Sequence, residues 1–316
     1  MTKKITRRSF IKRGTVLGAV SLFSSSVLGL FTGSFGRLFG GKAPDISVVK
    51  GKDYFNNTIK AVDLLGGMKR FVPKNAKVAI LPNSQRNNPG VYTNPEIVKA
   101  VIRMCKQAGA AEVNCLTWLP DKIWKDTGLI EAVKSEGANL VVADMKDESQ
   151  FKSVPVPKGK ALKEARIMGE FFKNDVFITI PISKDHAGNK FTATLKNMMG
   201  LNSPKSNRTF HKKDWSTNPD SVAFLDQCIA DLNTVLTPDL CIVDSTKFIT
   251  TNGPFGPGKL AEPQEIVAGT DRVAVDSYCC GLLNLKPEEI FMIRRAQEHG
   301  IGQMDLSKLT IKKVTA

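Results

Sequence analysis

Two histidines and three cationic side chains lie close together in the middle of the chain. Lysine and arginine can hold a carboxylate or a phosphate, and an imidazole can transfer a proton because its ordinary pKa lies near neutrality. We therefore predict a pocket for a small anion, which Lys184, Lys196 and Arg208 would position. His186 would be the acid or base, with His211 in support, and Lys184 joins them as a catalytic candidate. The alternative is a solvated loop with scattered polar side chains.

The same part of the sequence could hold a metal ion instead. Carboxylates and imidazoles are metal ligands, and histidine suits zinc, copper, iron or nickel. The chemically suitable residues are Asp185, His186, His211, Asp244, Asp271 and Asp276. No spacing among them is diagnostic. A metal ion therefore stays an alternative cofactor, with Asp271 and Asp276 as its candidate ligands or as groups that orient the pocket.

A segment rich in glycine and proline, residues 252–259, supplies further ligand-binding candidates: Asn252, Gly253 and Gly258. Gly253 and Gly258-Lys259 match most of a phosphate-binding P-loop. However, Leu260 stands where such a loop needs Ser or Thr for magnesium, and the two prolines lack the N–H groups that would point at phosphate. The segment predicts a rigid turn that lines a pocket rather than an ATP site.

Buried strands that alternate with helices must position these residues. The predicted strands are Lys77–Pro82, Val113–Trp118, Leu140–Ala143, Val176–Pro181 and Leu240–Asp244, with Leu309–Val314 as an edge strand. A helix begins at Asn94-Pro95, a capping residue followed by a favoured first residue, and stops at Gly109. This order predicts an α/β fold, with a mostly parallel sheet and helices on both faces.

Ligands of such sheets bind beyond the carboxyl ends of the strands. The predicted loops there are residues 83–92, 183–200, 208–211 and 252–259. Asn197, beside Lys196, is for this reason another candidate ligand-binding residue.

The N-terminal residues Thr6–Lys12 contain the pair Arg7-Arg8 and precede an apolar stretch, as in a twin-arginine export signal. We expect residues 1–42 to be signal peptide and linker, and residues 43–316 to be a single α/β domain. The expected partner is the twin-arginine translocase and the expected location is the periplasm. Membrane anchoring by an uncleaved signal is the alternative.

The formal charge of +15 overstates how basic the remainder is. Residues 1–42 carry eight of the 45 Lys and Arg and no acid, which leaves +7 for residues 43–316. These cations are spread along the chain without a stripe of interleaved aromatics, so nucleic-acid binding is disfavoured.

The six cysteines form no Cys-x-x-Cys and no ferredoxin-type cluster motif. Cys105, Cys115 and Cys241 lie among apolar neighbours, and buried free thiols are the expected state. The adjacent Cys279-Cys280 is the remaining redox candidate.

Several segments resemble the domain of unknown function 362 family, in order over residues 75–285. They are Asn94-Pro95-Glu96, Asp175–Pro181, Lys184 with His186, Lys196-Asn197-Met198-Met199-Gly200, Asn252-Gly253-Pro254 and Gly269–Asp276. The resemblance implies an α/β fold, a link to iron–sulfur proteins, because some members carry ferredoxin-like modules, and a site lined by the Lys-x-His and Lys-Asn positions. This chain lacks the ferredoxin motif, so an intrinsic cluster is not expected.

The sequence therefore predicts an exported, redox-linked enzyme that binds a small anion in a pocket of Lys, His and Arg. The alternative is a non-catalytic periplasmic module that binds a metal or ligand, or that assists an iron–sulfur redox partner protein.

Overall fold

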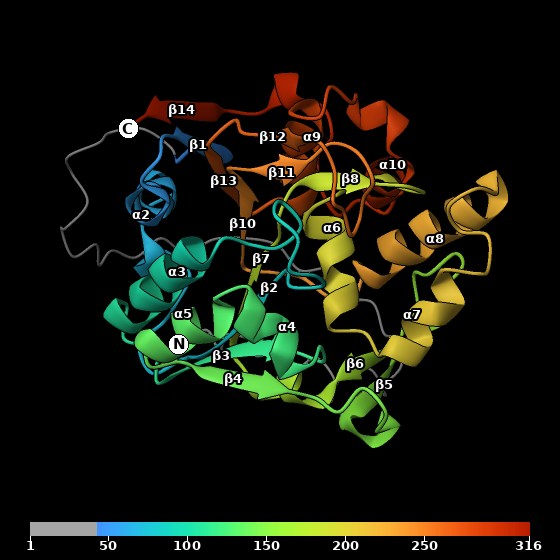
Figure 1. Ribbon diagram of the computed structural model, residues 1–316, viewed down its shortest axis with the longest axis horizontal. Coiled ribbons are helices and arrows are strands. Elements are labelled where there is room, and N and C mark those ends of the chain that lie inside the picture. The colour runs from blue at the N-terminus through green and yellow to red at the C-terminus, as the bar shows by residue number, and fades with distance from the viewer. Residues whose placement is uncertain (1–42) are drawn as a thin grey trace, which may run out of the picture. The chain divides into compact units, whose positions relative to one another are not determined.

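An eight-stranded sheet organises residues 43–316, the part of the chain that the computed structural model describes (Figure 1). Its strand order is β14-β1-β13-β10-β7-β2-β3-β4. The bounds are β1 Ile46–Lys50, β2 Lys77–Pro82, β3 Glu112–Thr117, β4 Asn139–Val142, β7 Val176–Ile180, β10 Leu240–Ser245, β13 Glu265–Gly269 and β14 Ile311–Thr315. Only β13 runs against its neighbours, so the prediction of a mostly parallel α/β sheet is confirmed.

Helices cover both faces of the sheet (Figure 1). One face packs against α2 Tyr54–Leu64, α3 Pro95–Gln107, α4 Asp121–Asp126 and α5 Leu129–Ser135. The other packs against α6 Thr194–Asn197, α8 Pro219–Leu232, α9 Arg272–Gly281 and α10 Phe291–Glu298. In β2, Val78 and Ile80 join one core while Ala79 and Leu81 join the other. Strands buried on both faces are apolar throughout, which is why they could be recognised in the sequence.

The start of α3 follows its sequence signals. The Asn94 side chain accepts a hydrogen bond from the Glu96 N–H at 2.9 Å, and Pro95 is the first helical residue. The amide of Asn94 donates in turn to Asp244 at the end of β10, at 2.7 Å. This bond fixes the helix start against the carboxyl edge of the sheet.

The connections between the main strands and helices contain shorter elements. They are α7 Pro204–Phe210, the strand pairs β5 Phe151–Pro155 with β6 Glu164–Met168, β8 Lys184–His186 with β9 Lys190–Thr192, β11 Phe248–Ile249 with β12 Leu260–Ala261, and the 3₁₀ turns η1 Met68–Arg70, η2 Glu148–Gln150, η3 Gly169–Lys173, η4 Met198–Gly200, η5 Pro287–Glu289 and η6 Leu306–Lys308. The strands β1 and β6 were not recognised in the sequence, because short strands carry little periodicity.

Residues Pro44–Ala316 form one compact unit. The predicted export signal, residues 1–42, lies outside the described residues. Within the described part, no helix has both the length and the apolar content to cross a bilayer.

Candidate functional site

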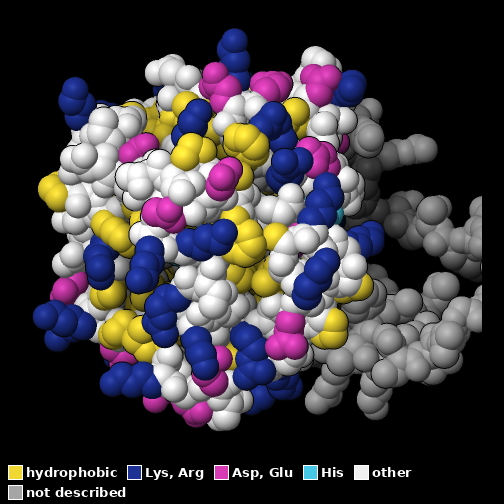
Figure 2. All heavy atoms as spheres, turned by 90° about the vertical axis from the view of Figure 1, so that its right-hand side faces the viewer, with side chains coloured by type: hydrophobic (Ala, Val, Ile, Leu, Met, Phe, Trp, Pro, Cys, Tyr) yellow, Lys and Arg dark blue, Asp and Glu magenta, His cyan; other side chains and the backbone are white. Residues whose placement is uncertain are grey.

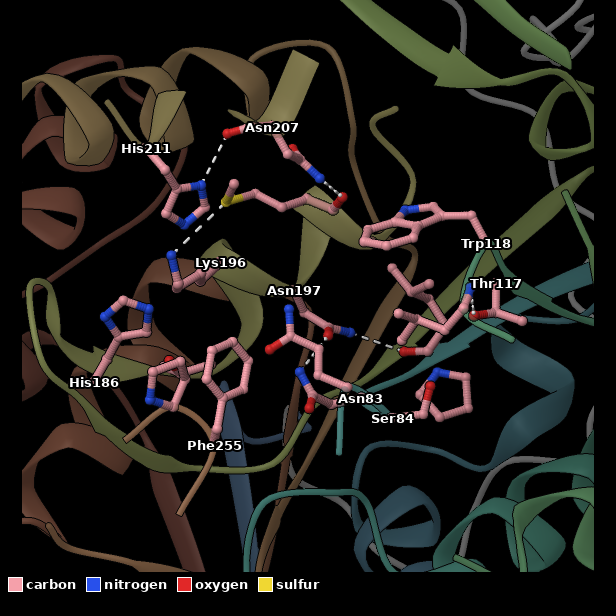
Figure 3. Close-up of a pocket in the computed structure, with 18 of the residues that line it drawn as sticks. Asn83, Ser84, Thr117, Trp118, His186, Lys196, Asn197, Asn207, His211 and Phe255 are labelled. Atoms are coloured by element: carbon pink, nitrogen blue, oxygen red, sulfur yellow. Dashed lines mark hydrogen bonds between the residues drawn. The ribbon is translucent and has the colours of Figure 1, made fainter. Parts of the chain in front are cut away.

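A cavity of about 320 Å³ lies beyond the carboxyl ends of β2 and β3 (Figure 3). Its lining is Leu81, Pro82, Asn83, Ser84, Gln85, Thr117, Trp118, Leu119, His186, Thr192, Lys196, Asn197, Met199, Gly200, Asn207, His211, Trp215, Pro254 and Phe255. The lining contains one lysine, two histidines and no carboxylate. The cavity lies where open parallel sheets usually bind ligands. The volume of the cavity is at the small end of the range for ligand pockets.

The short helix α6 brings Lys196 and Asn197 to the cavity. Buried Asp276 of α9 accepts the backbone N–H groups of Thr194 and Leu195 at 2.8 and 2.9 Å, which caps the start of α6. Burial raises the pKa of Asp276 to about 7, against the effect of these hydrogen bonds. Asp276 therefore acts on the site by anchoring the helix that carries it.

Asn197 ties α6 to the sheet edge. Its Nδ2 donates to the Leu81 carbonyl at 2.9 Å and to Thr179 Oγ1 at 3.0 Å, and its Oδ1 accepts from Asn83 Nδ2 at 3.2 Å. Asn197 thus links β2, β7 and the loop after β2, as well as lining the cavity.

Lys184 lies behind this layer and is not among the lining residues. Its fully buried Nζ donates to the Val91 carbonyl at 2.8 Å and to Asn83 Oδ1 at 3.2 Å. Burial, followed by the charge of Lys196, lowers its pKa to about 7. With both acceptors in place, Lys184 holds the loop after β2 rather than a ligand.

His186, at the end of β8, is held as one neutral tautomer. Its Nδ1 accepts the N–H groups of Gly188 and Asn189, both at 3.3 Å, so the ring proton is on Nε2. Burial lowers the pKa of the ring well below its ordinary value, and the nearby charge of Lys196 adds to this. His186 is therefore a neutral N–H donor in the cavity.

His211, which follows α7, is held as the opposite tautomer. Its Nδ1 lies 2.8 Å from the Asn207 carbonyl, which can only accept, so Nδ1 carries the proton and Nε2 a lone pair. Burial, then the charge of Lys196, lowers the pKa of the ring to about 4. Trp215 packs against both rings, with centroids 5.0 Å from His186 and 5.3 Å from His211.

Lys196 lies between the two imidazoles in Figure 3. Its Nζ approaches only Met199 Sδ, at 3.8 Å, and no ion pair of the described residues includes it. Burial lowers its pKa, and the nearby carboxylate of Asp226 opposes the shift. A buried ammonium without an oxygen acceptor is costly, so a bound anion would complete its coordination.

Asp226 of α8 supports the cavity from behind and was not recognised in the sequence. Its buried carboxyl accepts from the Asn189 side chain, and the Asn189 backbone fixes the tautomer of His186. Burial raises the pKa of Asp226, while the charge of Lys196 opposes this. No local pattern marks such a residue, because its role depends on contacts between distant segments.

In the glycine and proline segment, the predicted residues Asn252, Gly253 and Gly258 shape the turn and do not line the cavity. A Cβ at Gly253 would lie 1.8 Å from the Asp185 carbonyl oxygen, and the Gly253 amide donates to the Asp185 carboxylate at 2.7 Å. Gly258 and the exposed Asn252 likewise shape the turn, through a close backbone approach and a bond to the Pro257 carbonyl. Pro254 and Phe255 line the cavity, and the Arg86 guanidinium stacks 4.9 Å over the Phe255 ring.

Arg208 does not join the predicted cluster. Asn207 of α7 and His211, the residue that caps the end of α7, lie four positions apart and both line the cavity. Arg208, the residue after Asn207, is exposed and outside the lining. Figure 2 views the molecule from the side of α7 and α8 and shows Lys and Arg side chains spread over that face, with fewer acidic ones among them. Arg208 is one of the exposed cationic side chains of the molecule.

The residues proposed as metal ligands have other partners. Asp271 caps α9 by accepting from the Val273 and Ala274 amides and also accepts from Gln303. Asp276 caps α6, as described above. Between residues 43 and 316, no group of three or more His, Cys, Asp or Glu side chains is arranged to hold a metal ion.

The cysteines do not fit an iron–sulfur cluster. All six are free and buried, and burial raises the pKa of Cys105, Cys228 and Cys280 to about 12. Among residues 43–316 these thiols do not gather with other His, Cys, Asp or Glu side chains in a group of three or more that could hold a metal. Cys279 and Cys280 are buried on α9, where burial also raises the pKa of Cys279.

Two lining residues hold polar atoms that lack a partner. Trp118 Nε1 and Thr192 Oγ1 are buried and make no hydrogen bond. Trp118 stands at the end of a predicted strand, where its place in the site could have been anticipated. Unpaired buried polar groups are rare and costly, so both side chains add to the free-energy cost of forming this part of the structure.

A sequence model of the family described as "Domain of unknown function (DUF362)" matches residues 78–281, more than half of the chain. A thylakoid-associated protein of Synechocystis sp. is 24% identical over 274 residues, which cover 81% of this chain and 80% of the relative. The lactate racemase apoprotein from Thermoanaerobacterium thermosaccharolyticum has a TM-score of 0.49 at 14% identity, over 76% of this chain and 57% of that one. A protein from Thermotoga maritima has a TM-score of 0.41 at 14% identity, over 61% of this chain and 51% of that one.

Proposed function

The chain belongs to the DUF362 family, whose description names no reaction, and from this premise we propose that it is an enzyme that acts on a small anion by proton transfer. One observation carries the proposal. The cavity joins a buried lysine without an oxygen partner to two neutral histidines of opposite tautomer, and its lining has no carboxylate.

Each group has a part in this scheme. The ammonium of Lys196 attracts the anion, the Nε2 lone pair of His211 accepts a proton, and the Nε2–H of His186 donates to developing negative charge. Exclusion of water strengthens these interactions. The basic face around α7 and α8 (Figure 2) favours the approach of anions over that of cations.

Imidazole NMR tests the proposal, because the chain has three histidines and His299 supplies an internal control. His299 lies outside the cavity and its Nε2 is 2.7 Å from Asp231 Oδ1. Titration with acetate, pyruvate and phosphate should shift the ring signals of His186 and His211 and leave those of His299 in place. Unchanged signals for all three rings with every anion would refute the proposal. Saturable binding without turnover in a substrate screen would favour a non-catalytic ligand-binding module.

We further propose that residues 1–42 export the folded protein to the periplasm through the twin-arginine translocase. The pair Arg7-Arg8 supports this. Replacing both with lysine should retain the protein in the cytoplasm on cell fractionation, and unchanged export would contradict the proposal. A redox partner with an iron–sulfur cluster stays a prediction from the family resemblance.

A further inference from the structure

We propose that Lys196 is a nucleophile and that it condenses with the carbonyl carbon of a small anionic oxo acid. The inference rests on the proposed function, because it names the ligand class and the bond-forming atom of the same cavity. It makes Lys196 a catalytic residue, whereas the sequence predicted it to bind the anion.

The contrast between the two buried lysines identifies the nucleophile. Lys184 Nζ has two oxygen acceptors and lies outside the lining. Lys196 Nζ faces the cavity with only a thioether beside it. An amine attacks a carbonyl only as the free base, and desolvation favours that form in both lysines. Of the two, only Lys196 has access to the cavity.

The two histidines provide the proton transfers that imine formation needs. His211 Nε2 takes a proton from the Lys196 ammonium, and the Nζ lone pair forms a bond to the carbonyl carbon. His186 Nε2–H donates a hydrogen bond to the resulting oxyanion, and His211 returns its proton there to give the carbinolamine. His211 then takes a second proton from Nζ and gives it to the hydroxyl, which leaves as water. The products are one iminium and one water, and the positive charge stays at Nζ.

The remaining lining explains why the carbonyl compound would be an acid. No carboxylate lines the cavity to repel one, and the iminium N–H and the Nε2–H of neutral His186 would each attract one. A carboxylate next to the carbonyl would accept from such groups. The volume of about 320 Å³ lies within the range of small-molecule pockets, so it admits an oxo acid of three carbon atoms as well as larger ones.

Reductive trapping tests the inference on the full chain without knowledge of the overall reaction. The protein is incubated with pyruvate or glyoxylate, reduced with borohydride, digested and analysed by mass spectrometry. We expect one reduced adduct, on Lys196. The adduct should be absent in Lys196→Met, unchanged in the exposed control Lys205→Met, and formed at least tenfold more slowly in His211→Asn. Peptide mapping of the wild-type protein gives the answer even if Lys196→Met does not fold.

The outcomes separate this inference from the proposed function. An adduct on other lysines alone, or equal labelling by the uncharged methyl ester of pyruvate, overturns the assignment of an oxo acid to Lys196. Saturable binding of pyruvate at the cavity histidines without any adduct overturns the inference and leaves the proposed function standing. If no anion perturbs His186 or His211 and no adduct forms, both are refuted.

Discussion

The buried charge of Lys184 makes a quantitative prediction about stability and pH. Burial lowers its pKa from 10.5 to about 7 in the folded chain, whereas the unfolded side chain keeps its proton to about pH 10. Between these values the unfolded state binds more protons, so the free energy of unfolding must rise with pH. The full effect corresponds to about 5 kcal/mol, at 1.36 kcal/mol per pKa unit.

The substitution Lys184→Met isolates this effect. It removes the charge and the hydrogen bonds to Asn83 and Val91, and the lost bonds add an offset that does not change with pH. The stability of the wild type relative to the variant should rise by roughly 1.6 kcal/mol between pH 7 and pH 8.5. The buried cysteines, which ionise only after unfolding, are present in both proteins and cancel in this difference.

Urea unfolding of both proteins at several pH values in this window measures the difference. If the two stability curves stay parallel from pH 7 to pH 8.5, folded Lys184 has an ordinary pKa, and the reasoning from its burial is wrong. If the difference rises as calculated, the cluster of two buried lysines is a real electrostatic cost of the fold.

Three further predictions follow from single contacts. Gly253→Ala should destabilise the chain by more than about 3 kcal/mol in urea unfolding, because its Cβ would meet a backbone oxygen at 1.8 Å; the control Gly281→Ala, with nothing within 4 Å, should be neutral or slightly stabilising. The pKa of His211 is lowered to about 4 in the folded chain, so below about pH 6.5 the unfolded chain binds more protons than the folded one. The free energy of unfolding should therefore fall between pH 6.5 and pH 4. In His211→Asn this fall should be smaller by about 3 kcal/mol, which urea unfolding at several pH values measures. Asp226→Asn removes the negative charge that opposes the shift in Lys196, so the amine pKa measured by lysine NMR should fall further; an unchanged value would mean that the carboxyl is already neutral.

The strands were predictable because their signal is local. Lys77–Pro82 coincides with β2, and four other predicted strands match β3, β4, β7 and β10 within one residue at either end. Continuous apolar runs identify strands that are covered on both faces. By contrast β1 pairs with β13 and β14, far away in the chain, and no pattern within five residues specifies such partners.

The sequence predicted which loops form the candidate site, but it could not predict which of their side chains face the cavity. Placing ligand loops at the carboxyl edge of a parallel sheet correctly brought together His186, Lys196, Asn197 and His211. The sequence could not show that Arg208 faces away, because the bounds of a seven-residue helix and the direction of each side chain are set by tertiary packing.

The two buried lysines differ in their hydrogen-bond partners, and this difference separates a structural lysine from one that can bind a ligand. Lys184 has a carbonyl and an amide oxygen at hydrogen-bond distance, so its buried charge contributes to holding the loop after β2. Lys196 has no oxygen acceptor, faces a cavity, and stands between two neutral imidazoles. A buried ammonium without an oxygen acceptor carries a free-energy cost that hydrogen bonds partly offset at Lys184. At Lys196 a bound anion would offset this cost, and the two tautomers beside it would let that anion exchange protons.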